Sequence, residues 1–237
     1  MMLAPNGVPG SRVLEGFLRM AQGRNARHEL YERPGHFQHP DGWGAVVADD
    51  GVFSRVRGLE ACWEDPAFPA LGDRRIVLLH ARRASSGGVR MENVHPFERV
   101  DDGESWYFSH NGTIRDPLPR SPRAEGVTDS EAYFDRLLEA IHAQGPLGEA
   151  EDVVASFRDY TSLNAFLVSE REAWVVSAWR GHEQYYTLRE CDTREGPVFS
   201  SEVIRELGGD WRPLASGEVL RIERGTGRIA RRRVALR

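Results

Sequence analysis

The chain has 237 residues, of which 40% are hydrophobic and 28% are charged, and its formal net charge is −5 at pH 7. A chain of this length can bury a sizeable core, as one large domain or two small ones, and its mild acidity argues against nucleic-acid binding as the main role. The sequence shows neither a signal peptide nor an apolar run of about 18 residues, so we expect a cytoplasmic protein that does not enter a membrane.

The two cysteines, Cys62 and Cys191, lie far apart in the sequence. Neither belongs to a CxxC pair or has a histidine nearby, so the sequence indicates neither a metal site nor a disulfide framework. We interpret both as small residues that are buried in the core.

The first part of the chain predicts a strand, a helix, a loop and a hairpin. Met1–Ala4 is a short apolar run that ends in a turn, and a helix capped by Ser11 is expected to continue to about Gly23. Residues 24–38 are polar and contain Pro-Gly, which is typical of a loop that covers a site. A hairpin over 45–57 follows, because β-forming residues flank an Asp-Asp-Gly turn.

Two glycines, Gly42 and Gly44, flank Trp43 at the entry to this hairpin. They indicate either a backbone that passes close to a ligand or a strand entry that is simply interrupted by glycine. The residues themselves favour neither interpretation.

The segment over 76–114 holds two apolar runs, Ile76–His80 and Ser105–Ser109, that predict strands. Arginines follow the first run, and Asn111-Gly112 follows the second. Polar residues at strand ends often form binding sites, although Asn-Gly by itself is a common turn dipeptide. Together the two runs predict a candidate binding site at the ends of two strands.

The next segment predicts two helices. Residues 115–127 contain three prolines and resemble a surface loop. Thr128 and Glu131 have the spacing of a capping box, which predicts a helix from this point to about Ala143. A second helix is expected over Leu147–Tyr160.

The last third of the chain is predicted to form strands, of which the first three make an antiparallel meander. The expected strands are Leu163–Ser169, Ala173–Trp179, Gln184–Leu188, Val198–Ser200 and Glu218–Ile222. The tail over 228–237 carries five arginines, and we interpret it as a solvated terminal strand in preference to a nucleic-acid contact. Strands and helices in mixed order, with hairpins, predict an α+β fold with antiparallel sheets, and we expect one domain over 1–237.

Five motifs in this order resemble the class II glutamine amidotransferases, which are N-terminal-nucleophile (Ntn) hydrolases. The motifs are HPDGWG at 39–44, HARRAS at 80–85, NVHPF at 93–97, HNGTI at 110–114 and TDSE at 128–131. The resemblance covers roughly residues 40–225. It implies a four-layer α-β-β-α sandwich of two stacked, mainly antiparallel sheets, with no metal and no organic cofactor.

The resemblance also implies roles for individual residues in binding glutamine. Arg82 takes the position that binds the α-carboxylate, for which the planar fork of arginine is well suited. Asp129 takes the position that binds the α-ammonium, although an acid in the first turn of a helix is also favoured by the helix dipole. Asn111 and Gly112 match the oxyanion hole.

Further positions of the family's glutamine pocket are less closely matched. His95 matches a residue that lines the pocket, and the segment around Trp43 lies beside it in the family. Ser85 and Ser86 stand where the family often has Thr and His, and Arg83 replaces a frequent Trp, which changes the rim of the pocket.

The nucleophile of the family is an N-terminal cysteine, whereas this chain opens Met1-Met2-Leu3. A methionine thioether has no proton to lose and forms no acyl intermediate. We therefore expect a Met-Cys sequence upstream of Met1, with the mature protein starting at that cysteine and its first strand facing Arg82 and Asn111. The alternatives are a catalytically inactive binding or regulatory relative, and a γ-glutamyl amidohydrolase that acts on another metabolite. If ammonia is transferred, we expect its acceptor on a separate synthetase subunit.

Overall fold

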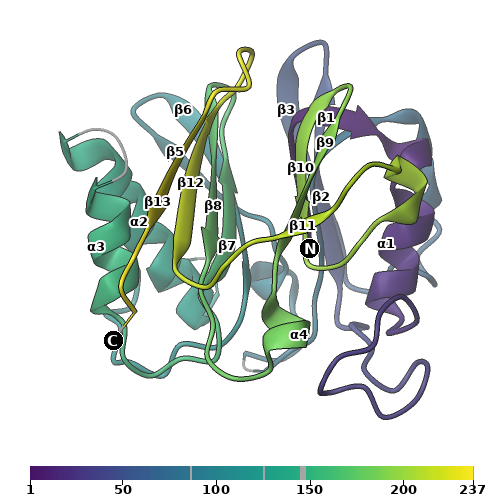
Figure 1. The fold of residues 1–237 in the computed structure, drawn as a ribbon, viewed down its shortest axis with the longest axis horizontal. Coiled ribbons are helices and arrows are strands. Elements are labelled where there is room, and N and C mark those ends of the chain that lie inside the picture. Colours follow the sequence, from purple (N-terminus) through teal and green to yellow (C-terminus); the bar gives the residue numbers. More distant parts are fainter. Residues whose placement is uncertain (86, 125, 145–147, 237) are drawn as a thin grey trace.

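The structure is a computed structural model that describes residues 1–85, 87–124, 126–144 and 148–236. Two antiparallel sheets pack face to face, and helices cover their outer faces (Figure 1). The first sheet has seven strands in the order β11 (Arg212–Pro213), β9 (Arg189–Thr193), β10 (Gly196–Ser200), β1 (Met2–Pro9), β4 (Arg75–Ala81), β2 (Trp43–Asp49) and β3 (Val52–Gly58). The second has six, in the order β13 (Ile229–Arg233), β12 (Glu218–Glu223), β8 (Glu172–Ser177), β7 (Asn164–Val168), β6 (Glu104–Asn111) and β5 (Phe97–Asp101).

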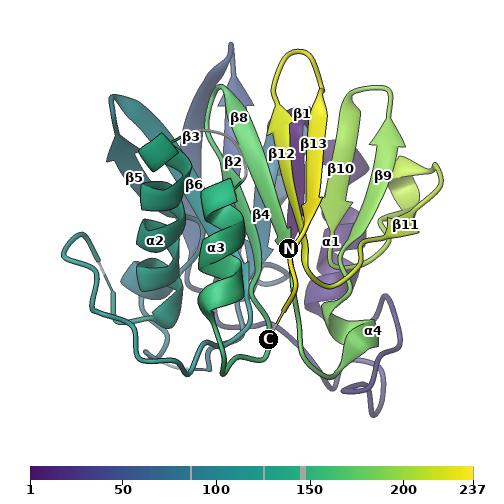
Figure 2. The same cartoon turned by 60° about the vertical axis from the view of Figure 1, so that its left-hand side comes forward.

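The helices lie on opposite sides of this pair of sheets. The α-helices are α1 (Leu14–Ala21), α2 (Asp129–Gln144), α3 (Gly148–Ser156) and α4 (Glu183–Tyr186), and the 3-10 helices are η1 (Gly10–Arg12), η2 (Pro69–Asp73), η3 (Met91–Asn93) and η4 (Arg205–Leu207). Helix α1 covers the first sheet, and α2 and α3 lie side by side on the second (Figure 2). This arrangement confirms the four-layer α-β-β-α sandwich predicted from the sequence.

Three buried apolar clusters correspond to the three interfaces between these layers. Strand β1 contributes to two of them, because successive side chains of a strand point to opposite faces. Met2 and Ala4 pack with the residues of α1, whereas Met1 and Leu3 pack between the sheets. Strand β1 is therefore an inner strand, paired on one side with β4 and on the other with β10.

Strands β4 and β6 belong to different sheets but end at the same edge of the sandwich. The imidazole Nε2 of His80 in β4 donates a hydrogen bond to the carbonyl oxygen of His110 in β6, over 3.3 Å. Helix α2 begins at this edge, because Asp129 accepts a hydrogen bond from the backbone of Ile114 just beyond β6. The strand ends that the sequence indicated are thus brought together.

The structure corrects the expected strand over Gln184–Leu188, where helix α4 forms instead. The backbone amides of Gln184 and Tyr185 donate to the carboxylate of Glu29, over 2.8 and 3.1 Å. Such an anion at a helix N-terminus satisfies amides that have no partner within the helix. Because Glu29 is more than 150 positions away, a local pattern could not have shown this contact.

Two predicted helix caps are also wrong. Helix α1 begins at Leu14 after the 3-10 turn η1, and no side chain caps either element, so Ser11 does not have the expected role. Helix α2 does begin after Thr128, but the hydroxyl of Thr128 is buried without a hydrogen-bond partner among the described residues. Glu131 accepts from the amide of Gly126 instead of closing a capping box.

Other features agree with the sequence or lie outside the described residues. Cys62 and Cys191 are free and buried, as predicted for small core residues. Helix α3 falls within the predicted Leu147–Tyr160, of which Leu147 itself lies outside the described residues. Over the described ranges, the helices are too short or too polar to cross a bilayer.

A buried ion network holds α2 against the second sheet. Arg99 of β5 donates to Asp135 over 3.1 Å and to Glu131 over 3.2 Å, and all three side chains are largely buried. We predict that Arg99→Ala lowers the free energy of unfolding by about 3–5 kcal/mol, because it leaves two buried carboxylates without their cation. Urea denaturation measures this change.

The matched control is Arg115→Ala, which removes an ion pair with Asp159 whose side chains are both more than half exposed. That substitution should cost less than about 1 kcal/mol. Equal losses from the two variants would contradict a supporting role for the buried network.

Candidate active site

A cavity of about 280 Å³ opens at the edge where β4, β6 and α2 meet. Its walls come from the ends of β4 and β6, the start of α2, the first residue of the chain, α1, the loop before β2, and α4. Arg82, Ser85, His95, Asn111, Gly112 and Asp129 all line it. Six candidate residues that are scattered over nearly fifty positions of sequence therefore share one cavity.

Trp43 is placed elsewhere. It is fully buried, its indole N–H donates to Asp65 over 2.8 Å, and its ring stands edge-on to Phe68 at 5.0 Å. The described residues that line the cavity do not include it, so this geometry gives no support to a contact between Trp43 and the substrate. Ser86 lies outside the described residues.

Arg82 is a buried cation at the cavity wall. The residue is only 5% exposed, and its Nη1 donates to the carbonyl oxygen of Gly88 over 2.8 Å. The backbone of Arg82 exchanges hydrogen bonds with Gly42 and Asp41, which fixes the residue just beyond β4. Burial lowers the pKa of the guanidinium, and the carboxylate of Asp41 opposes that shift. An arginine keeps its charge at neutral pH even after such a shift.

Asp129 connects α2 to the end of β6. Its Oδ2 accepts a hydrogen bond from the backbone N–H of Ile114 over 2.6 Å, and it occupies the first turn of α2. The carboxylate therefore has a structural role, and it also presents a negative charge to the cavity. A carboxylate in this position can stabilise the start of the helix and still be available to bind an α-ammonium group.

Gly112 lies where no side chain would fit. A Cβ at this position would come within 1.9 Å of the carbonyl oxygen of Ser162 and 2.9 Å of Nε2 of His110. The backbone after Asn111 is thus pressed against the segment before β7. This close approach fixes the direction of the Gly112 amide.

Three buried histidines, His80, His95 and His110, also line the cavity. The rings of His80 and His95 are 4.4 Å apart. Burial lowers the pKa of all three, so they are neutral at pH 7. In His110, Nε2 lies 3.0 Å from the carbonyl oxygen of Ser162, which can only accept, so Nε2 carries the proton and Nδ1 accepts from Ser130.

The first residue of the chain also lines the cavity. The amine of Met1 donates to Oγ of Ser201 over 2.8 Å, and its carbonyl oxygen accepts from the Ser201 amide. Burial lowers the pKa of this amine to about 5, and the charge of Glu202 opposes the shift. An amine in this environment is unprotonated at neutral pH and can accept a proton.

A further wall comes from residues to which the sequence gave no role. Phe37 and His39 belong to the loop before β2, Tyr185 belongs to α4, and Glu202 follows β10. His39 was part of a recognised motif, and the loop was expected to cover a site. Tyr185 and Glu202 reach the cavity only through the tertiary fold, and no local pattern indicated them.

The sequence model of the family described as glutamine amidotransferases class-II matches residues 30–165. The chain belongs to this family. A Haemophilus influenzae protein named as a putative glutamine amidotransferase is 32% identical over 110 residues, which cover 44% of this chain and 37% of that protein. YafJ of Escherichia coli, named in the same way, is 30% identical over 115 residues, which cover 46% and 45%. The chain thus spans less than half the length of these relatives.

Solved structures of amidotransferases share the fold of this class II chain. The allosteric regulatory enzyme of purine biosynthesis matches with a TM-score of 0.69 at 17% identity, over 100% of this chain and 48% of that one. The glutamine phosphoribosylpyrophosphate amidotransferase of B. subtilis matches with a TM-score of 0.67 at 15% identity, over 100% and 49%. A protein of Pseudomonas aeruginosa described as a predicted glutamine amidotransferase matches with 0.56 at 21%, over 80% and 86%. These matches confirm the fold expected from the five motifs.

The neutral histidines lead to a prediction about pH. A histidine whose pKa is lowered by folding binds a proton below about pH 6.5 only in the unfolded chain, so its contribution to stability is lost as the pH falls. The free energy of unfolding should decline as the pH falls. We predict that His95→Phe makes this decline shallower by up to about 1.4 kcal/mol per pH unit. Urea denaturation at several pH values between about 7 and 5 measures the slope.

The control is Val94→Ala, because Val94 is buried, precedes His95 in the chain and carries no titratable group. This substitution should leave the slope as it is in the unsubstituted protein. A slope that His95→Phe does not change would show that the imidazole is not held neutral by the fold.

Proposed function

We propose that this cavity binds glutamine or another γ-glutamyl amide and that the protein hydrolyses the γ-amide bond. The observation that carries the proposal is the convergence of four groups on one cavity. Arg82 comes from the end of β4, Asn111 and Gly112 from the end of β6, and Asp129 from the start of α2. A cation, an anion and two candidate amide donors are the set that an α-amino acid with a side-chain amide requires.

The charges suggest one orientation for the substrate. The α-carboxylate pairs with the fork of Arg82, and the α-ammonium pairs with Asp129. The γ-carbonyl oxygen is then directed to the side-chain amide of Asn111 and the backbone N–H of Gly112. Donors of this kind stabilise the negative charge that develops on the oxygen during attack, typically by about 3–4 kcal/mol for one donor.

The nucleophile in the proposal is the thiol of a cysteine joined to Met1, as the family resemblance implies. The thiolate attacks the γ-carbonyl carbon, the bond from carbon to nitrogen breaks, and the nitrogen leaves as ammonia after taking a proton. Water then adds to the thioester carbon, the carbon–sulfur bond breaks, glutamate leaves, and the sulfur takes a proton to restore the thiol. The free α-amine of that cysteine serves as the base. Burial lowers the pKa of the corresponding amine in the chain that begins at Met1, and an amine with a lowered pKa is suited to accept and return the proton.

A second candidate function follows from Met1 itself. Met1 lines the cavity, and its thioether offers no nucleophile. A protein that starts at Met1 is proposed to bind the ligand without cleaving it, as a regulatory relative would. In the hydrolytic form, ammonia either leaves to water or passes to a separate synthetase subunit.

The role of Arg82 can be measured by calorimetry with L-glutamine. We predict that Arg82→Ala weakens binding by about 3–5 kcal/mol, because the buried α-carboxylate then has no cation. Arg82→Lys should recover little of this loss, since an ammonium cannot make the two-pronged contact. Arg90→Ala, at an exposed arginine of the following loop, serves as the control and should bind as the unsubstituted chain does. Full affinity in Arg82→Ala would make the arginine purely structural.

The nucleophile is tested with two proteins, the chain that begins at Met1 and the same chain extended by Met-Cys. We predict that the extended protein releases ammonia from glutamine, whereas the chain that begins at Met1 binds glutamine and releases none. An extension in which serine replaces the cysteine is the control, and it should be at least about a hundredfold slower.

Equal release of ammonia by the two proteins would place the nucleophile elsewhere. Binding without release in both would favour the regulatory function.

A further inference from the structure

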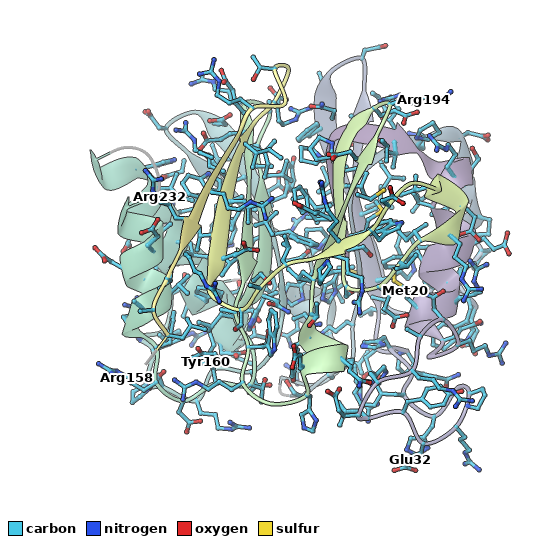
Figure 3. The ribbon with its side chains drawn as sticks, in the orientation of Figure 1. Met20, Glu32, Arg158, Tyr160, Arg194 and Arg232 are labelled. Atoms are coloured by element: carbon cyan, nitrogen blue, oxygen red, sulfur yellow. The ribbon has the colours of Figure 1, made fainter. Side chains whose placement is uncertain are left out.

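The cavity has two chemically different walls. The polar wall carries Arg82, Asn111 and Asp129. The other wall carries Phe17 and Met20 of α1, Leu30 and Phe37 of the loop after α1, and Tyr185 of α4. Figure 3 shows Met20 on the inner side of α1, directed towards the first sheet, and Glu32 at the outer tip of the loop. The described ring contacts place Phe37, His39 and Tyr185 in one group, which we call the aromatic wall.

The aromatic wall lies on the side of the chain's first residue. Oγ of Ser200 is 3.3 Å from the carbonyl oxygen of Met1 and 3.7 Å from the sulfur of Met20. Met1 and His39 both line the cavity, and the backbone N–H of His39 donates to the carbonyl oxygen of Ala21, one residue beyond Met20. In the proposed reaction the scissile bond lies beside the first residue, so this wall faces the group that leaves.

The aromatic wall is held in place before any ligand binds. The rings of Phe37 and Tyr185 meet edge to face with centroids 5.0 Å apart, and Nε2 of His39 is 3.2 Å from the hydroxyl of Tyr185. The guanidinium of Arg83 stacks over Phe37 at 4.0 Å. Glu29 ties the loop to the start of α4, so the wall is a preformed surface.

The aromatic wall would make no favourable contact with ammonia, which is the leaving group of glutamine. Ammonia is small and polar, and contact with apolar side chains stabilises it poorly. Apolar surface that stays in contact with water loses the stabilisation that its burial would give. An aromatic or aliphatic substituent on the amide nitrogen would cover that surface, and rings pack favourably edge to face.

We propose that the substrates of this site are γ-glutamyl amides of aromatic or apolar amines, with the amine substituent packed against Phe37 and Tyr185. This inference rests on the proposed function. Hydrolysis of such an amide consumes one water: the γ-carbonyl carbon takes the hydroxyl, the carbon–nitrogen bond breaks, and the nitrogen takes the remaining proton. The products are glutamate and the free amine.

The test compares the binding of γ-L-glutamylanilide and L-glutamine by calorimetry. It uses the chain that begins at Met1, which in the proposed function lacks the thiol and leaves both ligands intact. The anilide should bind at least about tenfold more tightly, because its ring buries apolar surface that glutamine leaves exposed. Phe37→Ala should weaken anilide binding by about tenfold and glutamine binding by less than about twofold.

Tyr31→Ala is the matched control, because Tyr31 belongs to the same loop and is not among the described residues that line the cavity. It should leave the binding of both ligands within about twofold. An equal loss of anilide binding in Tyr31→Ala and Phe37→Ala would attribute the effect to the order of the loop and overturn the inference.

The remaining outcomes separate the two proposals. Glutamine bound as tightly as the anilide, or more tightly, overturns the inference and leaves the proposed function standing. Binding of neither ligand overturns both.

Discussion

The site depends on one hydrogen bond that crosses from one sheet to the other. Nε2 of His80, at the end of β4, donates to the carbonyl oxygen of His110, at the end of β6. His110 in turn contacts Ser162 and Ser130 through its two ring nitrogens. Burial lowers the pKa of both rings, so these contacts are made by neutral imidazoles. Three hydrogen bonds thus join the ends of β4 and β6 to the segments around them, whereas Nδ1 of His80 is buried without a partner among the described residues.

The spacing of the proposed binding groups follows from this connection. Arg82 lies two residues beyond His80, and Asn111 lies one residue beyond His110. A cation and an oxyanion donor from different sheets are therefore held at a fixed separation, and Asp129 ties the start of α2 to the same edge through Ile114. This half of the cavity is built on strand ends, which position functional groups more accurately than loops do.

The two halves of the cavity also differ in how far the sequence could predict them. Strands β4 and β6 have clear apolar runs, and Arg82 and Asn111, in the motifs at their ends, both line the cavity. The aromatic wall depends on Glu29, whose carboxylate starts α4 from more than 150 positions away, so the sequence suggested a strand at Gln184–Leu188. For Trp43 the sequence suggested a place beside the substrate. The structure instead holds its indole in the core, where the ring N–H donates to Asp65. Local patterns report strands and motif order, whereas side-chain direction and long-range caps are decided by tertiary contacts.

The most direct test of this account is a crystal structure of the chain that begins at Met1, grown with L-glutamine. The account predicts glutamine in the cavity between the sheet ends, with its α-carboxylate on Arg82, its ammonium on Asp129, and its γ-carbonyl oxygen between Asn111 and the Gly112 amide. Glutamine bound in the reverse orientation, with its α-carboxylate at Asn111 and Gly112, would contradict it. So would a saturated crystal in which the ligand lies outside this cavity.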